Sequence, residues 1–180
     1  AAAAGKALAK AAPDVQVSVV GNTAALKAAK ASGLKMEHFA SITRDAQVQG
    51  EAMLSAKAKG SIAHVVAWGE GTVDVSHATV DGAWALPHVG GEAIIKPAEL
   101  SADAKAQAIV AHVMDWYKGS GDEWVSMGVP ATGDFGLGEG IFYSVPVVCS
   151  AKGYKRVGGL ALSPEVAAAM EASRAKLAAE

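Results

Sequence analysis

The chain has 180 residues, of which 51% are hydrophobic and 19% are charged, and its formal net charge is −2. This length and composition fit one globular domain and exclude a disordered chain, and the small net charge argues against a nucleic-acid partner. The single cysteine, Cys149, excludes an internal disulfide, and no apolar run approaches the roughly 20 residues that a membrane-spanning helix needs.

The first half of the chain alternates short helical and strand-like patterns, separated by Gly and Pro. In chain order, the predicted elements are a helix over residues 1–12 closed by Pro13, a strand over 15–20 ending at Gly21, helices over 23–31 and 45–59, a strand over 61–68, an edge strand over 73–80 and a loop over 81–92.

The second half contains the clearest helix. Ser101 is a favourable N-cap and Gly119 follows the last helical residue, Lys118. Apolar residues recur inside this helix at a period of 3.6 and predict its buried face. They are Ala102, Ala106, Ile109, Val110, Val113 and Tyr117.

Strands and one more helix complete the chain. Strand-like runs cover residues 124–129 and 141–148, and residues 154–162 predict a further hairpin or strand pair. Ser163 and Pro164 then begin a last helix. Its predicted inner residues are Val166, Met170, Ser173 and Leu177. This mixture indicates one α+β or α/β domain.

The common catalytic and cofactor motifs are missing from the sequence. It contains no dinucleotide fingerprint, no phosphate-binding P-loop and no nucleophile elbow. The spacing of the five histidines (His38, His64, His77, His88 and His112) favours no metal site, so we expect no metal. We interpret Cys149 as a buried small hydrophobic residue rather than a nucleophile.

Several segments nevertheless resemble the C-terminal, substrate-binding domain of malate dehydrogenases of the cytosolic and chloroplast type. The segments are WVSMGV (124–129), FYSVPV (142–147), the helix around His112 and Trp116, DVQVSVVGN (14–22), FASITR (39–44) and VAWG (66–69). The resemblance implies an α+β fold of the lactate/malate dehydrogenase C-terminal type, with an antiparallel sheet packed against long helices and no complete Rossmann domain. It also implies that residues 1–22 are a remnant of the nucleotide-binding half and that residues 23–180 form the substrate domain.

The same resemblance implies that the catalytic groups are lost. Gly71 stands at the position of the family's catalytic His, Ala46 at that of the Asp that orients it, and Gln49 at that of the substrate-binding Arg. Asp45, His77 and His88 are weak substitutes. Remnants of cofactor-binding positions are Gly21, Asn22, Ser126 and Met127.

These substitutions favour a catalytically degenerate protein that acts as a structural or accessory subunit. We expect no cofactor, a protein partner over the face that a nucleotide-binding domain would bury, and possible homo-oligomers. Two alternatives stay open. One is the substrate-binding half of a divergent or fragmentary malate dehydrogenase that uses NAD or NADP, and the other is a carboxylate-binding regulator. The start at Ala1 suits a chain after presequence removal, which favours a chloroplast or mitochondrion over the cytoplasm.

Overall fold

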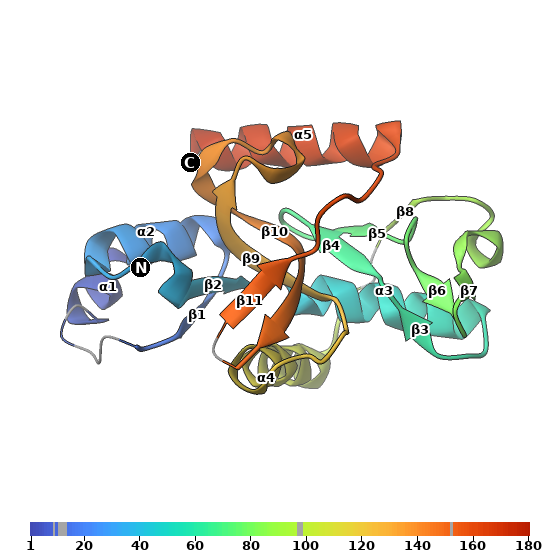
Figure 1. Ribbon diagram of the computed structural model, residues 1–180, viewed down its shortest axis with the longest axis horizontal. Helices are drawn as coiled ribbons and strands as arrows, with labels where there is room; N and C mark the ends of the chain where they lie inside the picture. The colour runs from blue at the N-terminus through green and yellow to red at the C-terminus, as the bar shows by residue number, and fades with distance from the viewer. Residues whose placement is uncertain (9, 11–13, 97–98, 152) are drawn as a thin grey trace.

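A five-stranded sheet with helices on both faces forms the centre of the computed structural model (Figure 1), which describes residues 1–8, 10, 14–96, 99–151 and 153–180. The helices are α1 (Ala2–Leu8), α2 (Asn22–Ser32), α3 (Arg44–Lys57), α4 (Ala102–Lys118) and α5 (Pro164–Ala179), with short 3₁₀ helices η1 (Met36–His38), η2 (Leu86–Val89) and η3 (Asp134–Gly136). The strands are β1 (Val17–Val20), β2 (Phe39–Ile42), β3 (Ile62–Ala63), β4 (Val66–Trp68), β5 (Thr72–Asp74), β6 (Thr79–Val80), β7 (Ala83–Trp84), β8 (Ile94–Ile95), β9 (Val125–Thr132), β10 (Glu139–Ser150) and β11 (Gly153–Arg156). Pro13, predicted to close the first helix, lies outside the described residues.

The central sheet is mixed, with the strand order β1-β2-β9-β10-β11. β1 runs parallel to β2, with Val17 opposite Phe39, whereas the remaining neighbours are antiparallel. The sheet therefore departs from the antiparallel arrangement that we expected. Residues 1–22 are built into this unit, because α1 packs on α2 and β1 extends the sheet beside β2.

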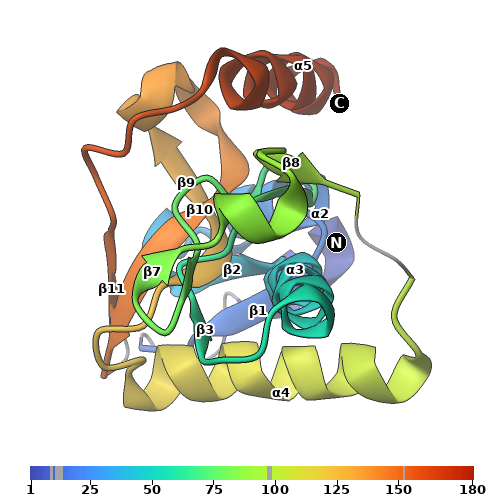
Figure 2. The same cartoon turned by 90° about the vertical axis from the view of Figure 1, so that its right-hand side faces the viewer.

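Two views show how the helices are placed around this sheet. α2 packs against β1, β2 and β10, whereas α4 packs against β9, β10 and β11 on the other side (Figure 2). α3 lies between α4 and two small three-stranded sheets, β3-β6-β7 and β4-β5-β8. α5 contacts β10 and β5 and buries Val166, Met170 and Leu177, as predicted.

Three strand predictions were wrong, because two of the predicted strands are interrupted and one predicted hairpin is absent. The single strand predicted over 61–68 is split into β3 and β4, because His64 has a φ of 60° that no strand residue adopts. The strand predicted over 73–80 is split into β5 and β6, because Asp74 Oδ1 accepts a hydrogen bond from the Ser76 N–H (2.8 Å) and closes a turn. Residues 154–162 form no hairpin, since only β11 is present and it pairs with β10.

The loop prediction for 81–92 was also incomplete. This segment contains the short strand β7 and the 3₁₀ helix η2, and β7 pairs with β6 through Thr79 and Trp84. Both residues of β7 are exposed, Trp84 by 62%, so β7 is an edge strand that adds little to the core.

The bounds of α4 were predicted correctly, but its buried face was not. Ser101 caps the helix as expected, since its Oγ accepts a hydrogen bond from the Ala104 N–H (3.2 Å). The face turned to the sheet consists of Ala108, His112 and Trp116, spaced four residues apart. The predicted stripe points the other way, and all four of its large side chains are exposed.

Replacing this cap gives a first testable prediction. We expect Ser101→Ala to lower the free energy of unfolding by about 1 kcal/mol, because the Ala104 N–H loses its acceptor. Urea denaturation followed by circular dichroism measures the change. Ser55→Ala is the control: Ser55 is exposed inside α3, where alanine is the better helix former, so a loss of stability there would contradict the capping explanation.

Candidate functional site

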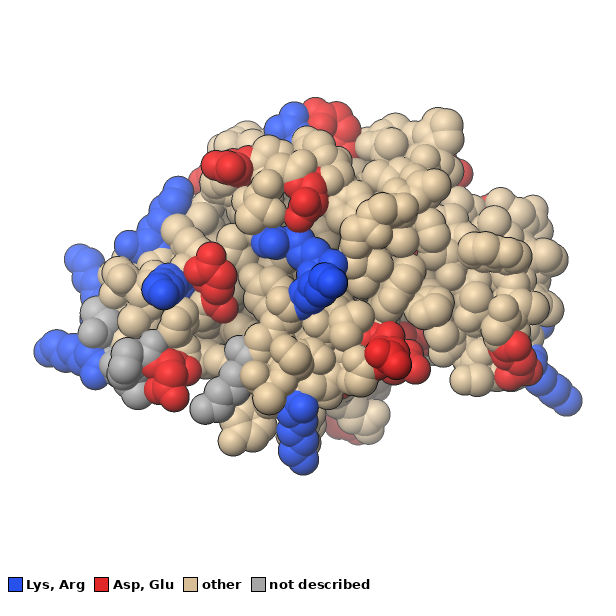
Figure 3. Space-filling view, in the orientation of Figure 1, with Lys and Arg blue, Asp and Glu red and all other residues tan. Residues whose placement is uncertain are grey.

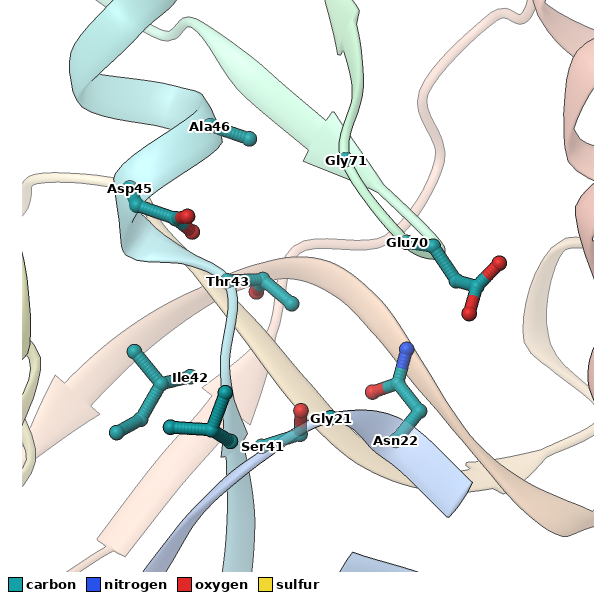
Figure 4. Close-up of a pocket in the computed structure, with 10 residues that line it drawn as sticks. Gly21, Asn22, Ser41, Ile42, Thr43, Asp45, Ala46, Glu70 and Gly71 are labelled. Atoms are coloured by element: carbon teal, nitrogen blue, oxygen red, sulfur yellow. The ribbon is translucent and has the colours of Figure 1, made fainter. Parts of the chain in front are cut away.

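A cavity of about 220 Å³ lies where three separate segments of the chain meet (Figure 4). Its walls are the ends of β1 and β2, the first residues of α2 and α3, and the turn between β4 and β5. Gly71 and Ala46 face each other across it: a Cβ built on Gly71 would lie 3.4 Å from Ala46 Cβ. Two positions that are 25 residues apart in sequence are thus neighbours here.

Two helices begin at this cavity without a side-chain cap. Gly21 precedes α2 and Thr43 precedes α3, and neither provides a capping hydrogen bond. The first N–H groups of a helix and its dipole favour negative charge nearby. Asp45, in the first turn of α3, contributes a carboxylate that Figure 4 shows directed into the cavity.

Asn22 ties the start of α2 to the β4–β5 turn. Its Nδ2 donates to the Gly69 carbonyl (2.9 Å), while its Oδ1 has no donor among the described residues. The backbone of β9 leaves room for this amide only because residue 128 is glycine, since a Cβ there would lie 2.4 Å from Asn22 Oδ1. The Asn22 side chain therefore has a fixed position on the cavity wall.

The hydroxyl groups beneath the cavity hold strands together. Thr43 Oγ1 donates to the Ser126 carbonyl (3.2 Å) and lies 2.7 Å from Ser144 Oγ, which donates to the Ala67 carbonyl (2.6 Å). Ser126 Oγ accepts from the Ala67 N–H (2.8 Å). Because these buried hydroxyls already have backbone partners, they connect β4, β9 and β10 and none is free to act as a nucleophile.

Acidic side chains, and no basic ones, line the cavity within the described part of the chain. They are Asp45 and Glu70. The Glu70 carboxylate turns away from the cavity (Figure 4) and pairs with Lys176 of α5, with Nζ and Oε2 2.7 Å apart. Arg44 also points elsewhere, since its guanidinium lies 3.6 Å from the Asp115 carboxylate of α4.

The structure brings together only part of the predicted set. Gly71, Ala46, Asp45, Gly21 and Asn22 all line the cavity. Ser126 and Met127 lie beneath it in β9, fully buried, and Gln49 is a partly buried residue of α3 outside the lining.

The two candidate histidines lie outside the cavity. His77 contacts Ser76 Oγ (3.2 Å) and stands 6.4 Å from the Trp124 ring, whereas His88 is exposed on η2. Cys149 is buried, and burial raises its pKa to about 12, so that its thiol stays protonated at neutral pH.

Sequence reasoning missed Ser41 and Thr43, which follow from the unpredicted strand β2. Thr43 directly precedes α3, and a threonine just before a helical pattern could have located it, although its hydroxyl bonds to Ser126 and Ser144 and does not cap the helix. Ser41 is fully buried, and its Oγ has no partner among the described residues. Nothing in the local sequence distinguishes it from a core position.

The remaining surface gives few functional signals. On the face shown in Figure 3, Lys and Arg side chains are interspersed with Asp and Glu, without a large area of one sign. The described residues contain no cluster of three His, Cys, Asp or Glu side chains suited to a metal ion. Within the same residues, every helix is too short or too polar to cross a membrane.

Comparisons with known proteins agree with this architecture. Malate dehydrogenase from Naegleria fowleri shares 28% identity, with a TM-score of 0.85 over 99% of this chain and 64% of that chain. Lactate dehydrogenase from Trichomonas vaginalis (22%, 0.85, 99% and 65%) and malate dehydrogenase from Plasmodium falciparum (14%, 0.77, 99% and 66%) share the fold. The chain thus spans about two thirds of the length of these proteins, 64% for the Naegleria enzyme.

A family model agrees with these structures. The model of the lactate/malate dehydrogenase α/β C-terminal domain matches residues 87–180, just over half of the chain. The α+β fold expected from the sequence is thereby confirmed, with a mixed sheet in place of an antiparallel one. The chain belongs to the lactate/malate dehydrogenase family.

Proposed function

We propose that this chain is a catalytically degenerate member of its family and serves as a structural or accessory subunit of a larger assembly. One observation carries the proposal. Gly71 and Ala46, which stand at the positions of the catalytic His and its Asp in the resemblance above, are neighbours across the cavity, with 3.4 Å between a Cβ at Gly71 and Ala46 Cβ. The facing arrangement is present, but neither residue carries a group that can transfer a proton.

The chemistry of the family makes this substitution severe. Reduction of a 2-ketoacid needs a hydride, a proton for the carbonyl oxygen and a cation that holds the carboxylate. Arginine suits the last task because its planar fork pairs bidentately with a carboxylate. Gln49 cannot replace that charge, and no Lys, Arg or His side chain lines the cavity among the described residues.

The described residues also offer little to a nicotinamide cofactor. Of the four remnant positions, only Gly21 and Asn22 line the cavity, because Ser126 and Met127 are buried beneath it. The sequence has no phosphate-binding glycine fingerprint. These observations support a chain that binds no NAD or NADP by itself.

A partner role is supported by the outer edge of the sheet. β1 is its last strand, paired on one side by β2, and the other side is unpaired among the described strands. Val20 at the end of β1 is 72% exposed. An open edge with an exposed apolar residue can serve as a site of polypeptide docking.

The proposal predicts that dehydrogenase activity does not depend on this chain. In the intact native assembly, we expect Asp45→Asn to leave NADH- and NADPH-dependent oxaloacetate reduction unchanged. The reason is that, within the described part of the chain, Asp45 is the lining carboxylate that forms no ion pair, and a divergent enzyme would depend on it. Activity is measured with the wild-type chain, with the variant and after depletion of the chain.

Depletion of the chain provides the control for this measurement. If the remaining assembly loses oxaloacetate reduction, and the Asp45→Asn variant loses it as well, the chain is the substrate-binding half of a divergent malate dehydrogenase. In that case the accessory role is refuted. If depletion of the chain makes the assembly fall apart, while the Asp45→Asn variant keeps the assembly intact, the role of the chain is architectural.

The uncapped helix starts favour a second candidate, a carboxylate-binding regulator. The N–H groups at the beginnings of α2 and α3 converge on the cavity and attract anions. The Asp45 carboxylate opposes an anion there, which makes this function the weaker candidate. Calorimetric titration of the chain with oxaloacetate and malate decides the point, because a regulator must bind at least one of them.

A further inference from the structure

The two helix starts at the cavity differ in charge. The first turn of α2 contains no acidic residue, so no side chain there neutralises the positive end of its dipole. The first turn of α3 contains Asp45, whose carboxylate is directed into the cavity (Figure 4) and forms no ion pair within the described residues. Glu70 is already paired with Lys176. The cavity therefore has a positive end at α2 and a negative end at Asp45.

Two buried oxygen atoms of cavity-lining residues have no hydrogen-bond partner in the described part of the chain. They are Asn22 Oδ1 and Ser41 Oγ, in residues that are 5% and 0% exposed. Both oxygens lie against Gly128, because a Cβ there would be 2.4 Å from Asn22 Oδ1 and 3.1 Å from Ser41 Oγ. A buried polar atom without a partner costs free energy, and a bound donor recovers it. These oxygens therefore favour a ligand with several N–H or O–H donors.

An ammonium group suits this set of acceptors. Its positive charge is attracted by the Asp45 carboxylate, and its three N–H donors find oxygen acceptors in Asp45, Asn22 and Ser41. The start of α2 favours a carboxylate instead, because its first N–H groups are donors. A molecule that carries both groups has no net charge. This matches a cavity that combines one free carboxylate with the positive ends of two helices, each equivalent to about half an elementary charge.

The rest of the lining favours a small aliphatic molecule. The volume of about 220 Å³ corresponds to about seven water molecules. Gly71 and Ala46 fill little of this space, because neither has a side chain beyond Cβ. Val20 and Ile42 are the large apolar residues of the lining, and Val20 is 72% exposed. An aliphatic group that covers Val20 removes apolar surface from water.

We infer that this cavity binds a small aliphatic α-amino acid as its zwitterion, with the ammonium group at Asp45 and the carboxylate at the start of α2. The inference goes beyond the accessory role proposed above and does not require it. It also differs from the carboxylate-binding regulator in the ligand that it assigns. Oxaloacetate and malate carry a carboxylate at both ends, so one of these carboxylates would meet Asp45, which repels it.

Calorimetric titration of the purified full chain with L-valine at neutral pH tests the inference. Isovalerate, which lacks the ammonium group, and isobutylamine, which lacks the carboxylate, are the comparison probes. We expect saturable binding of L-valine with a dissociation constant of about 1 mM or lower, and at least about 10-fold weaker binding of both comparison probes. The inference is overturned if L-valine shows no saturation up to about 10 mM, or if either comparison probe binds as tightly.

Three variants locate the binding site. Asp45→Asn should weaken L-valine binding at least about 10-fold and should strengthen isovalerate binding, because it removes the charge that attracts one probe and repels the other. Asp103→Asn is the matched control, since Asp103 is an exposed acid in the first turn of α4, and it should change neither affinity. Ser41→Ala should weaken L-valine binding by about 3-fold or more. It should leave the free energy of unfolding unchanged, because Ser41 Oγ has no partner within the described residues.

Circular dichroism confirms that each variant is folded before it is titrated. L-Valine binding that Asp45→Asn leaves unchanged overturns the inference. Binding of oxaloacetate or malate without binding of L-valine also overturns it, and identifies the carboxylate-binding regulator instead. None of these titrations measures dehydrogenase activity or the integrity of an assembly. Failure of this inference therefore leaves the accessory role standing, and failure of the accessory role leaves this inference standing.

Discussion

His112→Leu should make the chain markedly less sensitive to acid. Burial, with a smaller contribution from Arg44, lowers the pKa of His112 from 6.5 to about 4. The unfolded chain therefore binds a proton at His112 as the pH falls below 6.5, whereas the folded chain does not until about pH 4. Folding stability accordingly falls over this window, by about 3 kcal/mol for a shift of this size.

The His112→Leu variant separates the pH effect of His112 from that of the neighbouring carboxyl groups. Burial raises the pKa values of Glu51 and Asp115 nearby. Protonation of these two groups therefore stabilises the folded chain as the pH falls, which is opposite to the effect of His112. Urea unfolding of both proteins between neutral pH and about pH 4 gives their difference, which should grow in favour of His112→Leu towards acid. Both imidazole nitrogens lack partners among the described residues, so leucine breaks no hydrogen bond. His88→Leu, at an exposed position, should retain the full wild-type dependence. An equal pH slope for His112→Leu and the wild type would disprove the assignment.

Trp68→Ala should be the most destabilising single substitution that we consider. Trp68 is fully buried in the main core, its ring stands edge-on to Phe135 (5.0 Å between centroids), and its Nε1 donates to Asp74 Oδ2 (2.9 Å). Removing the indole leaves a large cavity and an acceptor without its donor. We expect a loss of about 3 to 5 kcal/mol in the free energy of unfolding.

Two comparison variants separate packing from exposure. Trp68→Phe keeps most of the buried ring and should cost less than Trp68→Ala, although Asp74 Oδ2 still loses its donor. Trp84→Ala removes the same side chain at a site that is 62% exposed, and should change stability by less than about 0.5 kcal/mol. Similar losses at the two tryptophans would contradict the burial argument. Guanidinium denaturation followed by far-UV circular dichroism measures all three.

α4 shows how far the sequence predicted the fold. Its caps at Ser101 and Gly119 are local signals, and both helix ends were predicted correctly. Its orientation was not, because the helix has apolar residues on two faces and periodicity cannot choose between them. The face that packs on the sheet is the line Ala108, His112 and Trp116, which includes a titratable residue and is less apolar than the outward line. The choice depends on packing partners that lie far away in sequence.

The candidate site was predictable only through the family resemblance. Gly71 and Ala46 carry no chemical signal of their own, and only the fold places them opposite each other. The break at His64 had no sequence signal either, because a left-handed histidine is set by the contacts around it. The lining of the cavity combines glycine, alanine and aliphatic residues with hydroxyl, amide and acidic side chains, a mixture that no single sequence motif marks.

The backbone of the β4–β5 turn determines how easily a histidine could be introduced at residue 71. Gly71 has a φ of 122° and Gly69 a φ of 59°, and a Cβ at Gly69 would lie 2.7 Å from Ser173 Oγ. A side chain at residue 71 would force an L-amino acid into left-handed backbone, at a cost of about 1–2 kcal/mol. One codon change to histidine would thus supply an imidazole on a strained turn. A functional histidine at residue 71 would therefore require a change in the backbone conformation of the β4–β5 turn, in addition to the substitution itself.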